Sequence, residues 1–365
     1  MERRIFTNAR TIGVMCGLMA IFFAAIAYLT GELVYRSLYV ILGMSAFLVV
    51  AISSKSYSTL VVSSAVFVAL LTSSLLNIES SGWRSLFGAF LFLASFGIGW
   101  AALEFRATRV LLELPFLFAI TVIAILDVFF GYGHREFNHL LEGSSRNVLS
   151  AILVMLGVGY LFSKWYRGCA PSLFPLFVLL FVSVSLYGRS GIVFSVAITI
   201  LAACARFGAR RLFLIFLMLV PLSGLFYGCF GEVFVESTNF RHGFESARFL
   251  MFIDYFSSLD VVGLFFGRDL WEVSVIADYG GNPHNAFLRL HAYHGLVVML
   301  FVVMVLSGFL LHLVNGRWFL ASLVIVVMAR AFFDIVVFFN LIDFAVFPLI
   351  FYSFYFARFR SCNLV

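Results

Sequence analysis

The sequence predicts an integral membrane protein built from α-helices, because it is strongly apolar and its apolar residues come in long blocks. Of 365 residues, 63% are hydrophobic and only 12% are charged, whereas a soluble domain carries about 25% charged residues. The blocks are roughly twenty residues long, the length with which a helix crosses about 30 Å of hydrocarbon. The ten-residue alternation of an outer-membrane barrel is absent from the sequence. We expect a single transmembrane domain over residues 1–365, without a cleavable signal peptide.

About twelve transmembrane helices are expected, with both ends of the chain in the cytoplasm and a large periplasmic loop between spans 9 and 10. Most of the 24 Lys and Arg residues then lie at cytoplasmic ends of spans, as the positive-inside rule requires. The long connections, residues 131–145 and 230–285, lie on the outer side. The predicted spans are 11–29, 37–53, 57–76, 84–103, 110–130, 146–163, 171–187, 190–206, 211–229, 286–312, 318–338 and 342–358.

This topology gives the outer side arginines but no lysines, since Lys55 and Lys164 both fall inside. The planar guanidinium grips phosphate oxygens bidentately. Arg189 lies in a tight outer turn and is a candidate for a fixed phosphate clamp, with an interfacial anchor as the alternative. Arg146 is a weaker candidate for a binding site or a glycan contact.

The long loop 230–285 contains a predicted amphipathic helix over residues 244–259. Arg248 lies on this helix and Arg268 follows it. A helix lying on the membrane could line a cleft for a lipid headgroup, whereas a solvated surface is the other interpretation. Both arginines are therefore candidates for binding an anionic lipid.

Asn282-Pro283-His284-Asn285, just ahead of a long apolar helix, is the sharpest candidate site. Asn is a favourable N-cap and Pro is favoured at the first helical position, so we expect His284 in the first turn. The positive end of the helix dipole favours a neutral imidazole, which suits a general base. The N–H groups there could also hold a diphosphate. The alternative is a helix cap with an interfacial histidine.

Four further ionisable residues fall at or inside predicted spans. Arg289 and His291 would enter the outer edge of the membrane, where such residues usually serve a site or a partner. Arg330 and Asp334 are four residues apart and can pair on one helix face. A buried structural pair is the interpretation that we favour for these two.

A metal site is not expected. His134, Glu136, His139 and Glu142 have a spacing that could fit a metal on a helix. No Asp-rich or HExxH signature accompanies them, and the five cysteines form no CxxC pair. We therefore predict neither a metal nor another cofactor.

Three stretches of the sequence, around Arg189, Arg248 and His284, resemble the O-antigen polymerase and ligase superfamily in their residues and in their order along the chain. The resemblance covers roughly residues 140–360. The family's ligases show His-Asn, a nine-residue gap, then Gly, as His284-Asn285 and Gly295 do here; Val298 stands where they carry a small or polar residue. The other two stretches are Gly188-Arg189-Ser190-Gly191 and Ser246-Ala247-Arg248 followed by Gly263 and Gly267.

The resemblance implies a metal-independent glycosyltransferase at the periplasmic face of the bacterial inner membrane. Its donor would be a glycan on undecaprenyl diphosphate. Its acceptor would be a lipid-linked repeat unit in a polymerase, which we expect, or lipid A–core in a ligase. His284 would be the base, and the substrate would contact Arg189, Arg248, Arg268, Arg146, Asn285, Arg289 and His291. Expected partners are this lipid-linked oligosaccharide, membrane lipids and a chain-length regulator.

Two other classes of function compete less well. A nucleic-acid partner is not expected, because the net charge of +6 comes from residues beside spans. A twelve-span transporter is the main non-enzyme alternative. Transporters place ionisable residues at the midplane and show related halves, whereas the unusual residues here cluster at one face.

Overall fold

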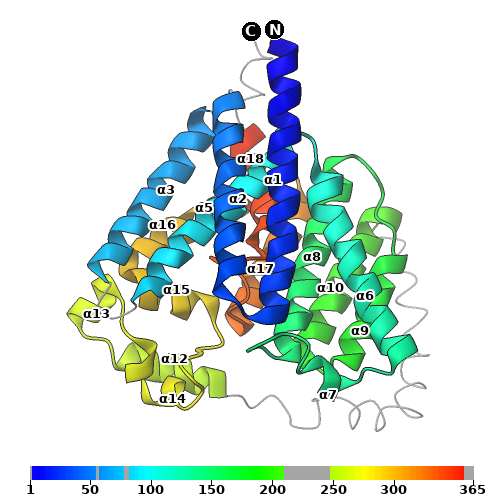
Figure 1. Ribbon diagram of the computed structural model, residues 1–365. Coiled ribbons are helices and arrows are strands. Elements are labelled where there is room, and N and C mark those ends of the chain that lie inside the picture. The colour runs from blue at the N-terminus through cyan, green and yellow to red at the C-terminus, as the bar shows by residue number, and fades with distance from the viewer. Residues whose placement is uncertain (1, 55–56, 78–81, 209–246, 357–365) are drawn as a thin grey trace. The chain divides into compact units, whose positions relative to one another are not determined.

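The computed structural model describes residues 2–54, 57–77, 82–208 and 247–356 (Figure 1). All regular elements in these ranges are helices, so the predicted all-α class is confirmed. Eight helices in the described ranges are long and apolar enough to cross a membrane, which supports a multi-pass membrane protein. Two further apolar helices are shorter, Phe174–Ser185 and Trp318–Phe333. The predicted span 211–229 and the first part of the 230–285 loop lie outside the described residues, and the count of twelve stays a prediction.

The chain divides into two compact units. Unit 1 comprises Met1–Leu112 and Ser246–Val365, and unit 2 comprises Glu113–Glu245. The helices of unit 1 are α1 (Glu2–Thr30), α2 (Leu33–Ser53), α3 (Tyr57–Leu76), α5 (Trp83–Glu104), α12 (Ala247–Ser257), α13 (Val261–Phe266), η3 (Leu270–Glu272), α14 (Ser274–Ala277), α15 (Ala286–His294), η4 (Gly295–Val297), α16 (Val298–Val314), α17 (Trp318–Phe333), η5 (Asp343–Ala345) and α18 (Phe347–Phe356).

Helix α5 forms the centre of unit 1 and is buried from Leu91 through Leu103. It packs closely on α2 because glycines meet at the crossing. A Cβ on Gly97 would lie 2.5 Å from the carbonyl oxygen of Gly43, so a larger residue would force the two helices apart. Small residues at such crossings let helix backbones approach each other within a membrane.

The short helices α12, α13 and α14 lie at the end of unit 1 away from the N-terminus of α1 (Figure 1). A helix, α12, lies within the segment predicted to be amphipathic, and its buried face includes Met251 and Tyr255. These two side chains pack with Leu288 and Ala292 of α15 in one apolar cluster. The segment before α15 is thus anchored to the helix that follows His284.

The backbone between α17 and α18 is not a continuous helix, although residues 318–338 and 342–358 were expected to form spans. Helix α17 ends at Phe333, and residues 335–340 have no helical structure. The expected helix over 334–338 is therefore wrong, and Phe338 and Phe339 have left-handed φ angles of +65° and +61°. Non-helical backbone at membrane depth is tolerated where the protein buries it and satisfies its polar groups. Val336 through Phe339 are indeed buried.

Unit 2 contains α6 (Leu114–Phe130), α7 (His134–Phe137), α8 (Arg146–Tyr166), α9 (Phe174–Ser185) and α10 (Arg189–Phe207), and η1 (Arg109–Glu113) leads into it. Helix α8 is its core and is buried from Leu149 through Ser163.

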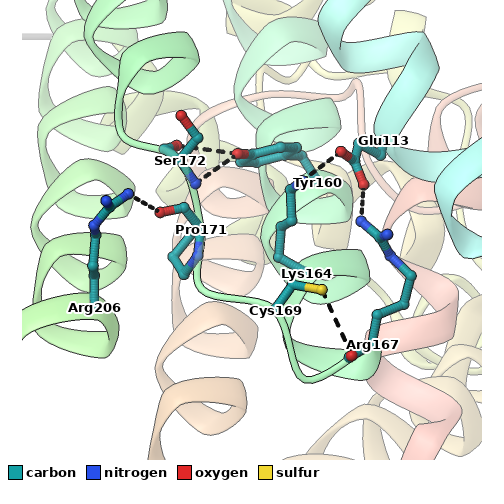
Figure 2. Close-up of polar contacts among 8 residues, drawn as sticks. All are labelled: Glu113, Tyr160, Lys164, Arg167, Cys169, Pro171, Ser172 and Arg206. Carbon is teal, nitrogen blue, oxygen red and sulfur yellow. Dashed lines mark hydrogen bonds and ion pairs between the residues drawn. The ribbon is translucent and has the colours of Figure 1, made fainter.

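Side chains fasten the connection between α8 and α9 (Figure 2). Buried Glu113 pairs with Lys164 at 2.6 Å and also with Arg167. The Tyr160 hydroxyl donates to the carbonyl oxygen of Ser172 and accepts from its N–H, both at 3.0 Å. Glu113, Tyr160, Lys164 and Arg167 thus all help to hold this connection in place.

Candidate functional site

The site segment has a different helix start from the one expected. Asn285, not Asn282, is the N-cap of α15, and its side-chain oxygen accepts from the N–H groups of Phe287 (2.9 Å) and Leu288 (3.2 Å). The expectation that His284 lies in the first helical turn is therefore wrong. Asn282 instead accepts from the N–H of His284 at 2.9 Å and closes a local turn across the proline.

His284 is held in a rare backbone conformation just before the helix. Its φ is +48°, in the left-handed region that few residues other than glycine adopt, although histidine is enriched among them. Such strain persists only where the surroundings impose it, and it clusters at functional sites. The capped helix on one side and the Asn282 turn on the other impose it here.

The surroundings of His284 favour its neutral form. The residue is half-buried, and burial lowers the pKa of its imidazole below the ordinary value. The guanidinium of Arg248 lowers this pKa further, whereas the carboxylate of Asp334 opposes the shift. The ring of Tyr279 meets the imidazole edge-on at a centroid distance of 6.3 Å. A neutral imidazole at pH 7 can accept a proton.

Charged groups from two other segments act electrostatically on His284. Arg248 of α12 lies over the Phe333 ring at 5.9 Å, and Asp334 follows α17. Arg330 donates to Asp334 at 3.2 Å, and both are buried, so the predicted pair is confirmed. Arg248 and Asp334 thus both influence the charge of His284, in opposite directions. The sequence singled out the Arg330–Asp334 pair but gave no sign that it approaches His284.

Arg289 and His291 use their polar atoms within unit 1. Arg289 donates to the carbonyl oxygens of Phe338 (2.6 Å) and Val337 (3.4 Å). The Nδ1 of His291 meets the Tyr255 hydroxyl at 2.8 Å, and its Nε2 meets the carbonyl oxygen of Leu264 at 3.0 Å. Since a carbonyl only accepts, Nε2 carries the proton and Nδ1 accepts from the tyrosine. Both side chains position the elements around the site.

A cavity of about 320 Å³ also lies in unit 1. Its walls come from the start of α5, from the segment between α13 and α15, and from Tyr293 of α15. Among the expected site residues only Arg268 lines it. The lining includes Trp83, Arg84, Arg268, Asp269, Trp271 and Tyr293. The sequence offered no pattern that would unite residues nearly two hundred positions apart.

Unit 2 carries the other two predicted arginines. Arg146 lies over the Tyr187 ring at 5.2 Å and donates to the carbonyl oxygen of His134 at 3.3 Å. Arg189 begins α10 directly after Gly188, as the tight-turn prediction required. The Nη1 atom of Arg189 is buried and has no hydrogen-bond partner among the described residues. Such a donor can be satisfied by an anionic ligand.

No protein-family model, curated protein or solved structure matches this chain. Its function is therefore inferred from its own residues and from the motif resemblance described above.

Proposed function

We propose that this chain is a polysaccharide polymerase of the O-antigen type in the bacterial inner membrane. It would transfer a glycan from undecaprenyl diphosphate to a lipid-linked repeat unit at the periplasmic face. The observation that carries the proposal is the strained, half-buried His284 at the head of α15, with Arg248 and Asp334 close enough to shift its pKa.

In this proposal His284 is the general base. The hydroxyl of the acceptor sugar attacks the anomeric carbon of the donor, and the bond from that carbon to the diphosphate oxygen breaks. The proton of the hydroxyl passes to the neutral imidazole. A well-placed base contributes about 10²–10⁴-fold to such a step.

Arginine side chains would stabilise the departing diphosphate. Its negative charge grows as the glycosidic bond breaks, and preorganised cations aimed at developing charge are a major source of catalysis. Arg248, whose charge lowers the pKa of His284, suits this role. Arg189 of unit 2, with its buried Nη1, stays a separate prediction of a phosphate contact. The charge stabilisation of this step would then come from the protein itself.

Transport of a lipid-linked sugar is the second candidate, and one observation favours it. The non-helical segment between α17 and α18 resembles the discontinuous helices with which transporters build binding sites. Its buried Asp343 accepts from the N–H groups of Phe338 and Asn340, both at 2.8 Å. In the proposed enzyme this segment instead supports Arg289 and the position of Asp334.

The test compares His284→Ala with His139→Ala, an exposed histidine of unit 2. Each variant complements a deletion strain, and surface polysaccharide is resolved on a gel. The expected result is that His284→Ala leaves single repeat units without a ladder, while His139→Ala restores the ladder. A normal ladder from well-expressed His284→Ala would contradict the proposal. Polymer formation in detergent solution, where no membrane has to be crossed, separates an enzyme from a transporter.

A further inference from the structure

The cavity of about 320 Å³ in unit 1 has the size and lining of a ligand site. Small-molecule pockets occupy roughly 300–1,000 Å³ and combine aromatic walls with a few placed polar groups. The proposed transfer step uses none of the cavity's aromatic residues. Their arrangement therefore calls for a separate explanation.

Two tryptophan side chains line the cavity and remain largely exposed. The backbone N–H of Trp271 donates to Asp269 Oδ1 at 3.0 Å, and the indole ring lies against Gly281. A Cβ on Gly281 would lie 2.9 Å from two atoms of the ring, so only glycine permits this contact. Trp271 remains 52% exposed, and Trp83, at the first position of α5, remains 55% exposed.

Planar polar groups stand beside the rings. Arg84 follows Trp83 at the start of α5 and is exposed. Arg268 is held by a hydrogen bond to the Ser258 carbonyl oxygen and by Glu272, whose carboxylate lies 3.5 Å from its Nε. Its side chain is still 25% exposed. The cavity thus offers a fixed donor on Arg268, a second donor on the exposed Arg84 and an acceptor on Asp269.

We infer that this cavity binds a sugar ring of the glycan substrate, flat against Trp271 or Trp83, with its hydroxyls bonded to Arg84, Arg268 and Asp269. The C–H face of a pyranose carries partial positive charge and complements the negative face of an indole. A phosphate alone would leave the rings unused. An acyl chain would offer no hydrogen bonds to Arg84, Arg268 and Asp269 while covering them, and removing polar groups from water without new partners is costly.

The position of the cavity indicates which sugar it would hold. Gly281 lines it and precedes His284 by three residues. Three residues span at most about 11 Å, so the cavity wall lies within about that distance of the proposed base. It would hold a sugar next to the reacting one and so select the glycan. This assignment rests on the proposed function, because it takes the ligand to be a glycan.

Calorimetry on the full-length protein in detergent tests the inference. The probe is the lipid-free repeat-unit oligosaccharide, released by mild acid from lipid-linked intermediates. Trp271→Ala and Trp83→Ala are compared with Trp318→Ala, a 68% exposed tryptophan at the start of α17. We expect about tenfold weaker binding for each cavity variant, the loss typical of one ring contact, and unchanged binding for Trp318→Ala. Undecaprenyl phosphate serves as a second probe, whose binding Trp271→Ala should leave unchanged.

Equal affinities of all three variants for the oligosaccharide would overturn the inference, as would the absence of binding to the wild-type protein. Loss of undecaprenyl phosphate binding in Trp271→Ala would also overturn it, because the cavity would then hold the lipid headgroup. His284→Ala should bind the oligosaccharide normally while losing transfer. Failure of the cavity variants to weaken binding, with transfer still dependent on His284, would therefore refute the cavity assignment and leave the proposed function standing.

Discussion

Arg289 of α15 donates a 2.6 Å hydrogen bond to the carbonyl oxygen of Phe338, a residue whose own φ is +65°. A single guanidinium thus binds carbonyl oxygens of the non-helical backbone. Asp343 performs the complementary task, because its two oxygens accept the N–H groups of Phe338 and Asn340. These contacts hold the segment that begins with Asp334, whose carboxylate raises the pKa of His284.

The first prediction concerns Asp343→Asn, which keeps the shape of the side chain but replaces one acceptor with a donor. The amide NH₂ would then face a backbone N–H, and a buried donor would lose its partner. We expect the protein to lose about 1–3 kcal/mol of stability. Thermal unfolding in detergent measures this, with exposed Asp278→Asn as the control. Equal melting temperatures for the two variants would show that Asp343 does not hold this segment.

The second prediction concerns the pH dependence of transfer. His284 acts when neutral, and its pKa lies below the ordinary 6.5, so activity should fall as the pH drops through a midpoint below 6.5. Arg248→Gln removes a cation that lowers this pKa and should move the midpoint up. Asp334→Asn removes a carboxylate that raises it and should move the midpoint down.

The profile of kcat/KM against pH measures both shifts. Arg135→Gln, at an exposed position in unit 2, should leave the midpoint in place. Shifts of Arg248→Gln and Asp334→Asn in the same direction would mean that another group titrates.

The third prediction concerns the geometry of the arginines. Lysine keeps the charge but loses the planar fork that holds two phosphate oxygens at once. Arg248→Lys and Arg189→Lys should each reduce polymer formation at least tenfold, nearly as much as alanine does. The exposed Arg135→Lys should retain full activity. Full activity of both lysine variants would identify Arg248 and Arg189 as simple interfacial anchors, and polymer length on a gel decides the matter.

The fourth prediction concerns topology. Asp278 is exposed in the segment before α15, and Cys169 is exposed in the turn between α8 and α9. In an otherwise cysteine-free protein, Asp278→Cys should react with a membrane-impermeant maleimide added outside the inner membrane. A variant that retains only Cys169 should react after lysis alone. The opposite pattern would place His284 in the cytoplasm and remove the proposed mechanism.

Local patterns predicted much of the fold. Apolar blocks predicted α1, α2, α5 and α8, and the period of its apolar residues predicted α12. The helix start at His284 was misplaced because two asparagines compete for the same role. Asn285 is the N-cap, because its side-chain oxygen accepts from two N–H groups of the helix. The side-chain oxygen of Asn282 instead accepts from the backbone N–H of His284. Capping preferences alone do not rank two candidates three residues apart.

Long-range contacts could not be predicted in the same way. Residues 318–338 read as one apolar helix because Phe338 and Phe339 carry no local signal for a left-handed conformation. That conformation depends on Asp343, five residues along the chain from Phe338, and on Arg289, which binds the segment from α15. The cavity between Arg84 and Arg268 likewise exists only when α5 meets the segment before α15. A pattern of residues along the chain contains no information on such contacts between distant segments.

The segment between α17 and α18 has a consequence for biosynthesis. Besides Arg289, Tyr28 donates to the Asn340 side chain and Ser95 donates to its carbonyl oxygen, both at 3.2 Å. All three partners are synthesised before residue 334 leaves the ribosome. Residues 334–340 can therefore form hydrogen bonds to these three side chains as soon as they enter the membrane, and these bonds can set their backbone conformation. A C-terminal fragment made without Tyr28, Ser95 and Arg289 would be free to form the uninterrupted helix that its apolar sequence favours.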